Sequence, residues 1–193
     1  MPSAAMADFA GLVLAGGASS RMGEDKALLR HGEHSLLELA VRRLTAAGAD
    51  PVLVSGDRPD YDCVPDSRPG LGPLGGLVSV INERPGLGNR LLLVTAVDTP
   101  GLSADNLLAL LRSMQAGDSG IHFDDHPLPL VLRVSDALHH ALDELLADGQ
   151  GASVRALAER LECRTLSPAE SDLRNINTPA DWTAFNRAGE LAV

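Results

Sequence analysis

The feature that most constrains this sequence is an apolar segment that ends abruptly in a run of small residues. Residues 9–14 (FAGLVL) have the composition of a short buried strand, and Ala-Gly-Gly-Ala-Ser-Ser follows them directly. Glycine lets the backbone approach a ligand closely, and loop amides outside a sheet ladder can donate to anionic oxygens. A strand that leads into such a loop is a common way for α/β folds to hold phosphate groups.

Two cations, Arg21 and Lys26, follow this run within one loop length. Two positive charges beside a glycine loop would neutralise a triphosphate, so we interpret the segment as a nucleotide site. The alternative is a strand-to-helix turn in which glycine only relieves crowding. The spacing matches neither a Walker loop nor a dinucleotide fingerprint, because 23–26 reads Gly-Glu-Asp-Lys and Gly16-Gly17 lacks the G-x-G-x-x-G pattern.

Composition limits the partners of this site. The 193 residues are 45% hydrophobic, enough for one domain with a real core, and only 3% are aromatic, which argues against a base-stacking nucleic-acid platform. The formal charge of −10 repels polyphosphate backbones at long range. A nucleotide must therefore be held by a local cationic loop, together with a divalent metal.

The sequence also bears on the cellular compartment. Its two cysteines, Cys63 and Cys163, have no metal-site spacing and are typical of isolated thiols in a reducing environment. The first eight residues lack a basic region, and no apolar stretch approaches the length of a membrane span. These features predict a cytoplasmic protein with no membrane association and no nucleic-acid partner.

Strand-like and helix-like segments alternate along the chain. Apolar strands are expected at 52–54 and 91–97, with short strands at 63–64, 120–123, 130–134 and 163–166. Helical periodicity or capping residues predict helices after Ser35, after Ser103, over 136–146, over 154–161 and after Thr178, and a further helix that begins at Leu77 after the Gly/Pro-rich loop 68–76. This alternation predicts an α/β fold with a mainly parallel, Rossmann-like sheet and helices on both faces.

Polar residues stand where these strands end. Ser55 follows the second strand, and Asp98 follows the most apolar run in the chain. Because parallel strands send their carboxyl ends to one edge, these side chains and the glycine loop are expected to line one crevice, with Asp98 as a Mg²⁺ ligand. Alternatively, Asp98-Thr99-Pro100 only starts a helix, and Asp66 only forms a turn. A metal site within 122–126 competes with a solvated turn between two strands.

The motifs, taken together, resemble those of the MobA-type molybdenum cofactor guanylyltransferases, in the nucleotidyltransferase superfamily. The matching segments are Leu-Ala-Gly-Gly at 14–17, Arg-Met-Gly at 21–23, Asp-Lys at 25–26, Gly-Pro-Leu-Gly-Gly at 72–76, Val-Asp-Thr-Pro at 97–100, His-Pro at 126–127 and Asn-Ile-Asn-Thr-Pro at 175–179. They occur in the family's order and span roughly residues 9–187. The resemblance implies the nucleotide-diphospho-sugar transferase type of fold, as one domain over 1–193, with a nucleotide-binding part at 9–101 and an acceptor-binding part at 102–187.

The resemblance also implies a reaction that joins GMP from GTP to the terminal phosphate of molybdopterin and releases pyrophosphate. The residues that carry over for the nucleotide, the metal and catalysis are Leu14, Ala15, Gly16, Gly17, Arg21, Lys26, Ser55, Asp66 and Asp98; those for the acceptor are Gly75, Asn175 and Asn177. Lys26 would contact the phosphates, Arg21 the leaving pyrophosphate, Asp66 the nucleoside and Asp98 a Mg²⁺ ion. Ser55 stands where the family often has asparagine, so the contact to the base or ribose changes there.

Other functions remain open at this stage. A cytidylyltransferase acting on the same pterin, or a sugar-phosphate nucleotidylyltransferase, would use the same loop. A nucleotide-binding regulator without catalysis would need no metal-placing carboxylate at Asp98. We expect a monomer that takes GTP and molybdopterin and makes transient contacts with molybdoenzymes or cofactor-delivery proteins.

Overall fold

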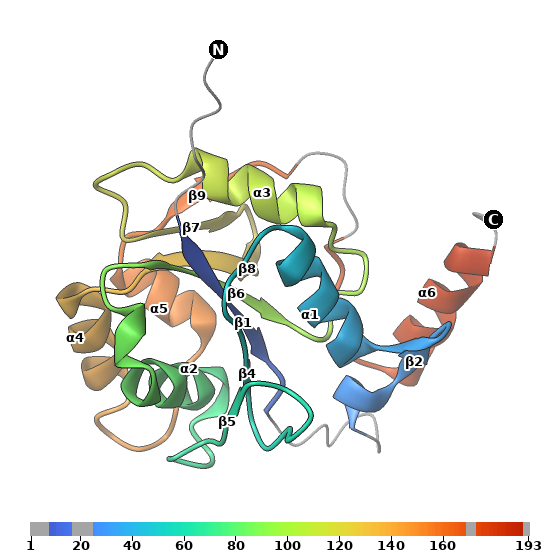
Figure 1. Ribbon diagram of the computed structural model, residues 1–193, viewed down its shortest axis with the longest axis horizontal. Helices are drawn as coiled ribbons and strands as arrows, with labels where there is room; N and C mark the ends of the chain where they lie inside the picture. The colour runs from blue at the N-terminus through green and yellow to red at the C-terminus, as the bar shows by residue number, and fades with distance from the viewer. Residues whose placement is uncertain (1–7, 17–24, 169–172, 191–193) are drawn as a thin grey trace.

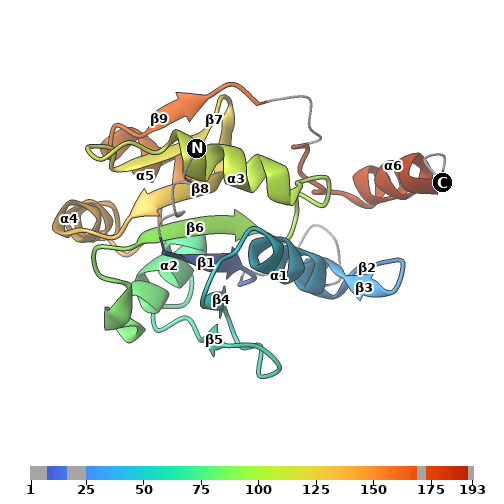
Figure 2. The same cartoon turned by 45° about the horizontal axis from the view of Figure 1, so that its top comes forward.

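The computed structural model describes residues 8–16, 25–168 and 173–190, the last three of these by their backbone alone. Within this part, seven strands form one sheet in the order β5-β4-β1-β6-β8-β7-β9 (Figures 1 and 2). The strands are β1 (Phe9–Leu14), β4 (Val52–Ser55), β5 (Cys63–Val64), β6 (Leu91–Ala96), β7 (Gly120–Phe123), β8 (His126–Arg133) and β9 (Arg164–Leu166).

Strand β1 lies between two parallel neighbours. Leu14 pairs in register with Ser55 of β4 on one side and with Ala96 of β6 on the other. Three strands therefore end at the same level, and the chain that leaves each of them enters the same edge of the sheet. This confirms the mainly parallel sheet and explains why residues from distant parts of the sequence meet there.

Strand β8 is the exception, because it runs antiparallel to both β6 and β7. The sequence predicted a strand only over 130–134, whereas β8 begins four residues earlier, at His126. A tight turn at Asp124 and Asp125, where Asp125 has a φ of 62°, reverses the chain directly after β7. A connection this short can join only antiparallel strands.

Helices cover both faces of the sheet (Figure 2). Helices α1 (Leu36–Ala46) and α3 (Ala104–Ser113) pack on one face, and α2 (Gly72–Glu83), α4 (Asp136–Leu145) and α5 (Val154–Arg160) pack on the other. Alternate residues of β1 serve the two cores: Phe9 and Val13 face α1, while Leu12 and Leu14 face α2. All six residues of β1 are buried, as expected for a central parallel strand.

Helix α6 (Pro179–Glu190) lies apart from the sheet, beside a small hairpin of β2 (Arg30–His31) and β3 (His34–Ser35) (Figure 1). The His31 ring contacts the Phe185 ring at a centroid distance of 4.9 Å. Short 3-10 helices, η1 (Lys26–Leu28) and η2 (Pro85–Leu87), complete the described elements. Within the described part of the chain, every helix is too short or too polar to cross a membrane.

The predicted helix caps are confirmed. Ser35 Oγ accepts a hydrogen bond from the Glu38 amide at 3.1 Å, and Ser103 forms a reciprocal capping box with Asn106. Thr178 Oγ1 accepts from the Asp181 amide at 3.2 Å at the start of α6. Each cap satisfies a backbone donor that the first helical turn leaves without a partner.

The predicted start of α2 was wrong. The helix begins at Gly72, five residues before Leu77, so most of the Gly/Pro-rich segment is helical. Pro73 occupies the first turn, where its fixed φ suits a helix and its missing N–H costs nothing. Gly75 and Gly76 are tolerated inside the helix because neighbours approach them closely: a Cβ on Gly76 would lie 2.8 Å from Ser55 Oγ. These glycines therefore serve close packing, which the helical period alone does not reveal.

Candidate active site

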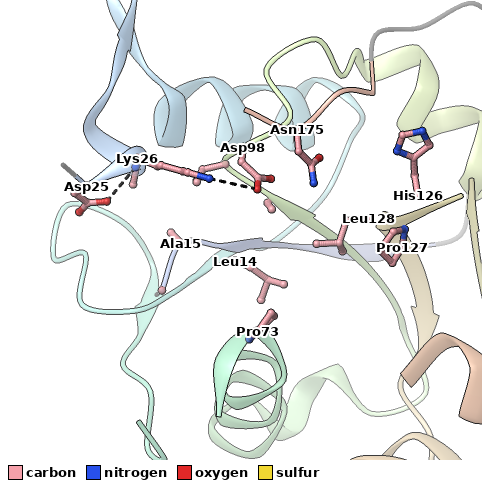
Figure 3. Close-up of a pocket in the computed structure, with 14 residues that line it drawn as sticks. Leu14, Ala15, Asp25, Lys26, Pro73, Asp98, His126, Pro127, Leu128 and Asn175 are labelled. Carbon is pink, nitrogen blue, oxygen red and sulfur yellow. Dashed lines mark hydrogen bonds and ion pairs between the residues drawn. The ribbon is translucent and has the colours of Figure 1, made fainter. Parts of the chain in front are cut away.

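A cavity of about 290 Å³ opens at the carboxyl ends of β1 and β6 (Figure 3). Its wall combines the exits of both strands, helix η1, the first turn of α2, the start of β8 and the segment before α6. The lining residues are Leu14, Ala15, Gly16, Asp25, Lys26, Ala27, Pro73, Ala96, Val97, Asp98, His126, Pro127, Leu128 and Asn175. The described ends of the predicted nucleotide loop, at residues 15–16 and 25–26, therefore share one crevice with the predicted metal carboxylate.

Lys26 and Asp98 lie side by side in the wall of this cavity. Lys26 Nζ lies 3.9 Å from Asp98 Oδ2, and the two side chains are only 16% and 23% exposed (Figure 3). Burial raises the pKa of Asp98 above the ordinary carboxyl range, while the Lys26 ammonium and nearby hydrogen bonds act in the opposite direction. A desolvated carboxylate beside a cation is a common arrangement where charged groups of a ligand are to be bound.

The segment before α6 folds back over this pair. The Ile176 amide donates to the Asp98 carbonyl oxygen at 2.7 Å, and Thr99 Oγ1 donates to Asn175 Oδ1 at 3.1 Å. Lys26 Nζ donates to Asn177 Oδ1 at 2.8 Å. Asn175 and Asn177, which the sequence assigned to the acceptor side, thus lie directly beside the two groups assigned to the nucleotide.

A second group of predicted residues meets one step along the sheet edge, beside β4. Ser55 is 1% exposed, and the space above Gly16 and the space above Gly76 both border the Asp66 carboxylate. Asp66 Oδ1 is buried without a hydrogen-bond partner among the described atoms, and burial raises the pKa of Asp66. Burial of a hydrogen-bond acceptor without a donor reduces the free energy of unfolding. The position suits a ligand that brings N–H or O–H groups.

Two of the predicted residues, Gly17 and Arg21, lie outside the described residues. Gly75 is described but does not line the cavity: it is buried inside α2, where a Cβ would lie 3.0 Å from Leu71 Cβ. Of the 122–126 segment, His126 lines the cavity, while His122 Nδ1 lies 2.8 Å from the Phe123 carbonyl oxygen and 3.0 Å from that of His126.

Sequence reasoning did not single out Arg58. Its Nη2 donates to Asp25 Oδ2 at 2.6 Å and to the Ala15 carbonyl oxygen at 3.2 Å, and both acceptors belong to the cavity wall. Arg58 lies in an irregular loop after β4 with no motif around it. No local pattern points to it, because its partners are 33 and 43 positions away.

Comparison with known proteins shows the family to which this chain belongs. Residues 11–168 match the MobA-like NTP transferase domain family. A molybdenum cofactor guanylyltransferase from Xanthomonas euvesicatoria is 43% identical over 177 residues, which cover 90% of this chain and 92% of that protein.

Solved structures share the fold at lower identity. The molybdopterin-guanine dinucleotide biosynthesis protein A from Archaeoglobus fulgidus superposes with a TM-score of 0.72 at 20% identity, covering 93% of this chain and 98% of the other. The 2-C-methyl-D-erythritol 4-phosphate cytidylyltransferase from Thermus thermophilus gives a TM-score of 0.67 at 17% identity, covering 93% and 99%. The fold therefore serves transferases of different nucleotides and does not by itself select the base.

Proposed function

This chain belongs to the MobA-like NTP transferase family, and from this premise we propose that it transfers GMP from GTP to the terminal phosphate of molybdopterin. The product is the guanine dinucleotide form of the molybdenum cofactor, and pyrophosphate is released. One observation carries the proposal: Lys26 and Asp98 lie 3.9 Å apart beside the carboxyl ends of β1 and β6, inside one cavity. The similarity to a named guanylyltransferase over nine-tenths of the chain supports it.

The proposed chemistry is an in-line displacement at phosphorus. An oxygen of the acceptor phosphate forms a bond to the α-phosphorus of GTP while the bond from that phosphorus to the bridging oxygen of pyrophosphate breaks. This reaction requires no protein nucleophile, so alignment and charge neutralisation provide the rate. Lys26 would neutralise phosphate oxygens, and the backbone of Leu14, Ala15 and Gly16 would cradle the nucleotide. We assign Arg21 to the departing pyrophosphate and Gly17 to the same loop from the sequence alone.

The residues at this site fit a Mg²⁺ ion. Mg²⁺ is commonly bound by one or two carboxylates together with substrate phosphates and water molecules, and Asp98 offers such a carboxylate at the strand end. Among the described residues, no group of three His, Cys, Asp or Glu could form an all-protein metal cage. Asp98 would thus hold the ion jointly with GTP. When bound, the ion would offset the negative charge on the phosphates.

Ser55 and Asp66 are proposed to contact the nucleoside. The buried Oδ1 of Asp66 has no partner in the described structure, and a carboxylate pairs well with two adjacent N–H groups. Guanine presents such a pair at N1 and N2, whereas cytosine does not. The Ser55 hydroxyl, 1% exposed, can replace only one hydrogen bond of the asparagine that the family often carries there.

We place the acceptor on the side of Asn175 and Asn177, whose side chains already contact Thr99 and Lys26. Gly75 remains a sequence-based prediction for this side, as its role would act through the packing of α2. The cytoplasmic location, the monomeric state and transient contacts with molybdoenzymes or cofactor-delivery proteins are also proposals that rest on the sequence and on the family's biosynthetic role.

The decisive experiment compares GTP, CTP, ATP and UTP as donors to molybdopterin in the presence of Mg²⁺, with product identified by mass spectrometry. We expect a clear preference for GTP. A preference for CTP would make the protein a cytidylyltransferase on the same pterin. Binding of GTP without any transfer would favour the non-catalytic regulator.

Two substitutions test the roles of Lys26 and Asp98. Lys26→Ala and Asp98→Ala should each reduce guanylyl transfer by about a hundredfold or more, with little change in the fold, because each removes a charge aligned with the phosphates. Arg112→Ala, in the last turn of α3 and outside the cavity lining, serves as a control for the loss of one cation. Near-normal turnover in Asp98→Ala would refute the metal role of this carboxylate.

A further inference from the structure

We infer that Arg58 is a positioning residue that ties together the two chain segments on either side of the nucleotide loop. One segment contributes the Ala15 backbone, and the other contributes Asp25 and Lys26. The inference rests on the proposed function only for the identity of the ligand, since the geometry concerns the protein alone. Nothing in the sequence motifs assigns a role to this arginine.

The contact geometry makes Arg58 a bridge. A single atom, Nη2, donates to Asp25 Oδ2 at 2.6 Å and to the Ala15 carbonyl oxygen at 3.2 Å. The two acceptor oxygens can therefore be no more than 5.8 Å apart, which is the sum of these two distances. Ala15 and Asp25 are ten positions apart in the sequence, and one guanidinium group holds both of them.

Asp25 transmits the constraint to Lys26. Its second carboxylate oxygen, Oδ1, accepts a hydrogen bond from the Ala27 amide at 3.0 Å and caps helix η1, whose first residue is Lys26. The same carboxylate thus joins Arg58 on one side and the start of η1 on the other. If Arg58 were removed, η1 would lose this link to Ala15, and the Lys26 ammonium, although still in contact with Asp98 and Asn177, would lose one constraint on its distance from the β1 exit.

The surroundings of Arg58 indicate a held side chain rather than an incidental surface pair. The side chain is 21% exposed, and its Nε is buried without a hydrogen-bond partner among the described atoms. A buried donor without a partner is costly, so the contacts made by Nη2 must outweigh this cost. By contrast, the Arg84–Asp62 pair has the same 2.6 Å distance, but its side chains are 37% and 50% exposed and neither residue lines the cavity.

The sequence offers a direct probe of this inference, because Lys26 is the only lysine in the chain. Trinitrobenzenesulfonate modifies amines, and peptide mass spectrometry distinguishes Lys26 from the amino terminus. We would compare wild type, Arg58→Ala, Arg58→Lys and the matched control Arg84→Ala without ligand. The rate of Lys26 modification then reports on its surroundings independently of any catalytic activity. Alkylation of the partly buried Cys163, whose thiol pKa is raised by its surroundings, reports on global opening in the same samples.

We expect Arg58→Ala to increase the rate of Lys26 modification several-fold without accelerating Cys163 alkylation. The Kd for Mg²⁺–GTP should rise between about tenfold and about a hundredfold, as expected when a charged group loses its alignment. Arg58→Lys should recover part of both effects, because one ammonium group can donate to both acceptors but reaches less far. Arg84→Ala should behave as wild type.

Three results would overturn the inference: an unchanged Kd in Arg58→Ala, equal effects in Arg58→Ala and Arg84→Ala, or parallel acceleration of Lys26 and Cys163 modification, which would mean general destabilisation. The proposed function fails separately, if wild type binds GTP but does not transfer GMP to molybdopterin. In that case the labelling and binding results still decide the role of Arg58.

Discussion

Replacement of Gly76 by alanine tests whether close packing at the edge of the sheet shapes the nucleoside site. Gly76 lies in α2, and a Cβ at this position would lie 2.8 Å from Ser55 Oγ, 2.9 Å from Ser55 Cβ and 3.2 Å from Asp66 Oδ1. Carbon atoms do not approach this closely without displacement, and Ser55 is fixed within β4. The added methyl group must therefore push α2, Ser55 or the Asp66 carboxylate aside.

Two opposing effects set the change in stability. Overpacking of a tight contact typically costs about 1–3 kcal/mol. Alanine in a helix interior regains roughly 0.5–1 kcal/mol relative to glycine. The net loss is thus about 0–2.5 kcal/mol, which for a chain of this size lowers Tm by up to about 10 °C. Stability alone therefore discriminates poorly, and the sharper effect is expected on nucleotide binding.

The assay measures KM for GTP and Tm in Gly76→Ala and in the control Gly86→Ala. At Gly86 a Cβ would meet nothing within 4 Å, so alanine there should leave KM unchanged and stabilise the protein by about 0.4–1 kcal/mol. In Gly76→Ala we expect KM to rise about tenfold, because a displacement of a few tenths of an ångström misaligns Ser55 and Asp66.

Equal KM values for the two variants would refute the reasoning. That result would mean that Ser55 and Asp66 do not contact the nucleotide, or that the helix yields without moving them. Measurement of the Kd for guanosine monophosphate, which lacks the outer phosphates, would separate a change at the nucleoside from one at the phosphate end.

Further predictions concern Asp98 and Cys163. Because burial raises the pKa of Asp98, the native state binds its proton more tightly than the unfolded chain, and the ionised carboxylate reduces stability at neutral pH. Asp98→Asn should therefore raise the Tm of the ligand-free protein at pH 7, and this advantage should shrink as the pH falls through the carboxyl range; a Tm below that of wild type at pH 7 would contradict it. Burial and the nearby Asp118 raise the pKa of Cys163 to about 11. At pH 8 its thiolate is thus scarce, and iodoacetamide should modify Cys163 far more slowly in the native protein than in urea; similar rates in both would show that the thiol is not protected.

The sequence predicted well those strands and helix starts that depend on residues close together in the chain. The continuous apolar run of β1 and that of β6 indicate strands buried on both faces, and Ser35, Ser103 and Thr178 mark helix starts through hydrogen bonds to residues three positions away. The general position of the site was also predictable, since the carboxyl ends of parallel strands share one edge.

The predictions that failed have a different cause. Two element boundaries were wrong: β8 begins at His126 rather than at residue 130, and α2 begins at Gly72 rather than at Leu77. Gly72 begins a helix because Pro73 fits its first turn and because Gly76 allows α2 to approach Ser55 on β4. Glycine and proline content predicts a loop from neighbouring residues alone, and tertiary packing overrides that preference.

The sequence by itself determined the strand and helix segments, the polar residues at the strand exits and the presence of a cationic glycine loop. Only the tertiary structure decided which side chains meet: Lys26 with Asn177 across 151 positions, and Arg58 with Asp25 across 33. The physical reason is the distance along the sequence over which each kind of interaction acts. Periodicity and capping depend on residues within one or two turns, whereas these contacts exist only because the fold places β4 and the segment before α6 beside the exit of β1.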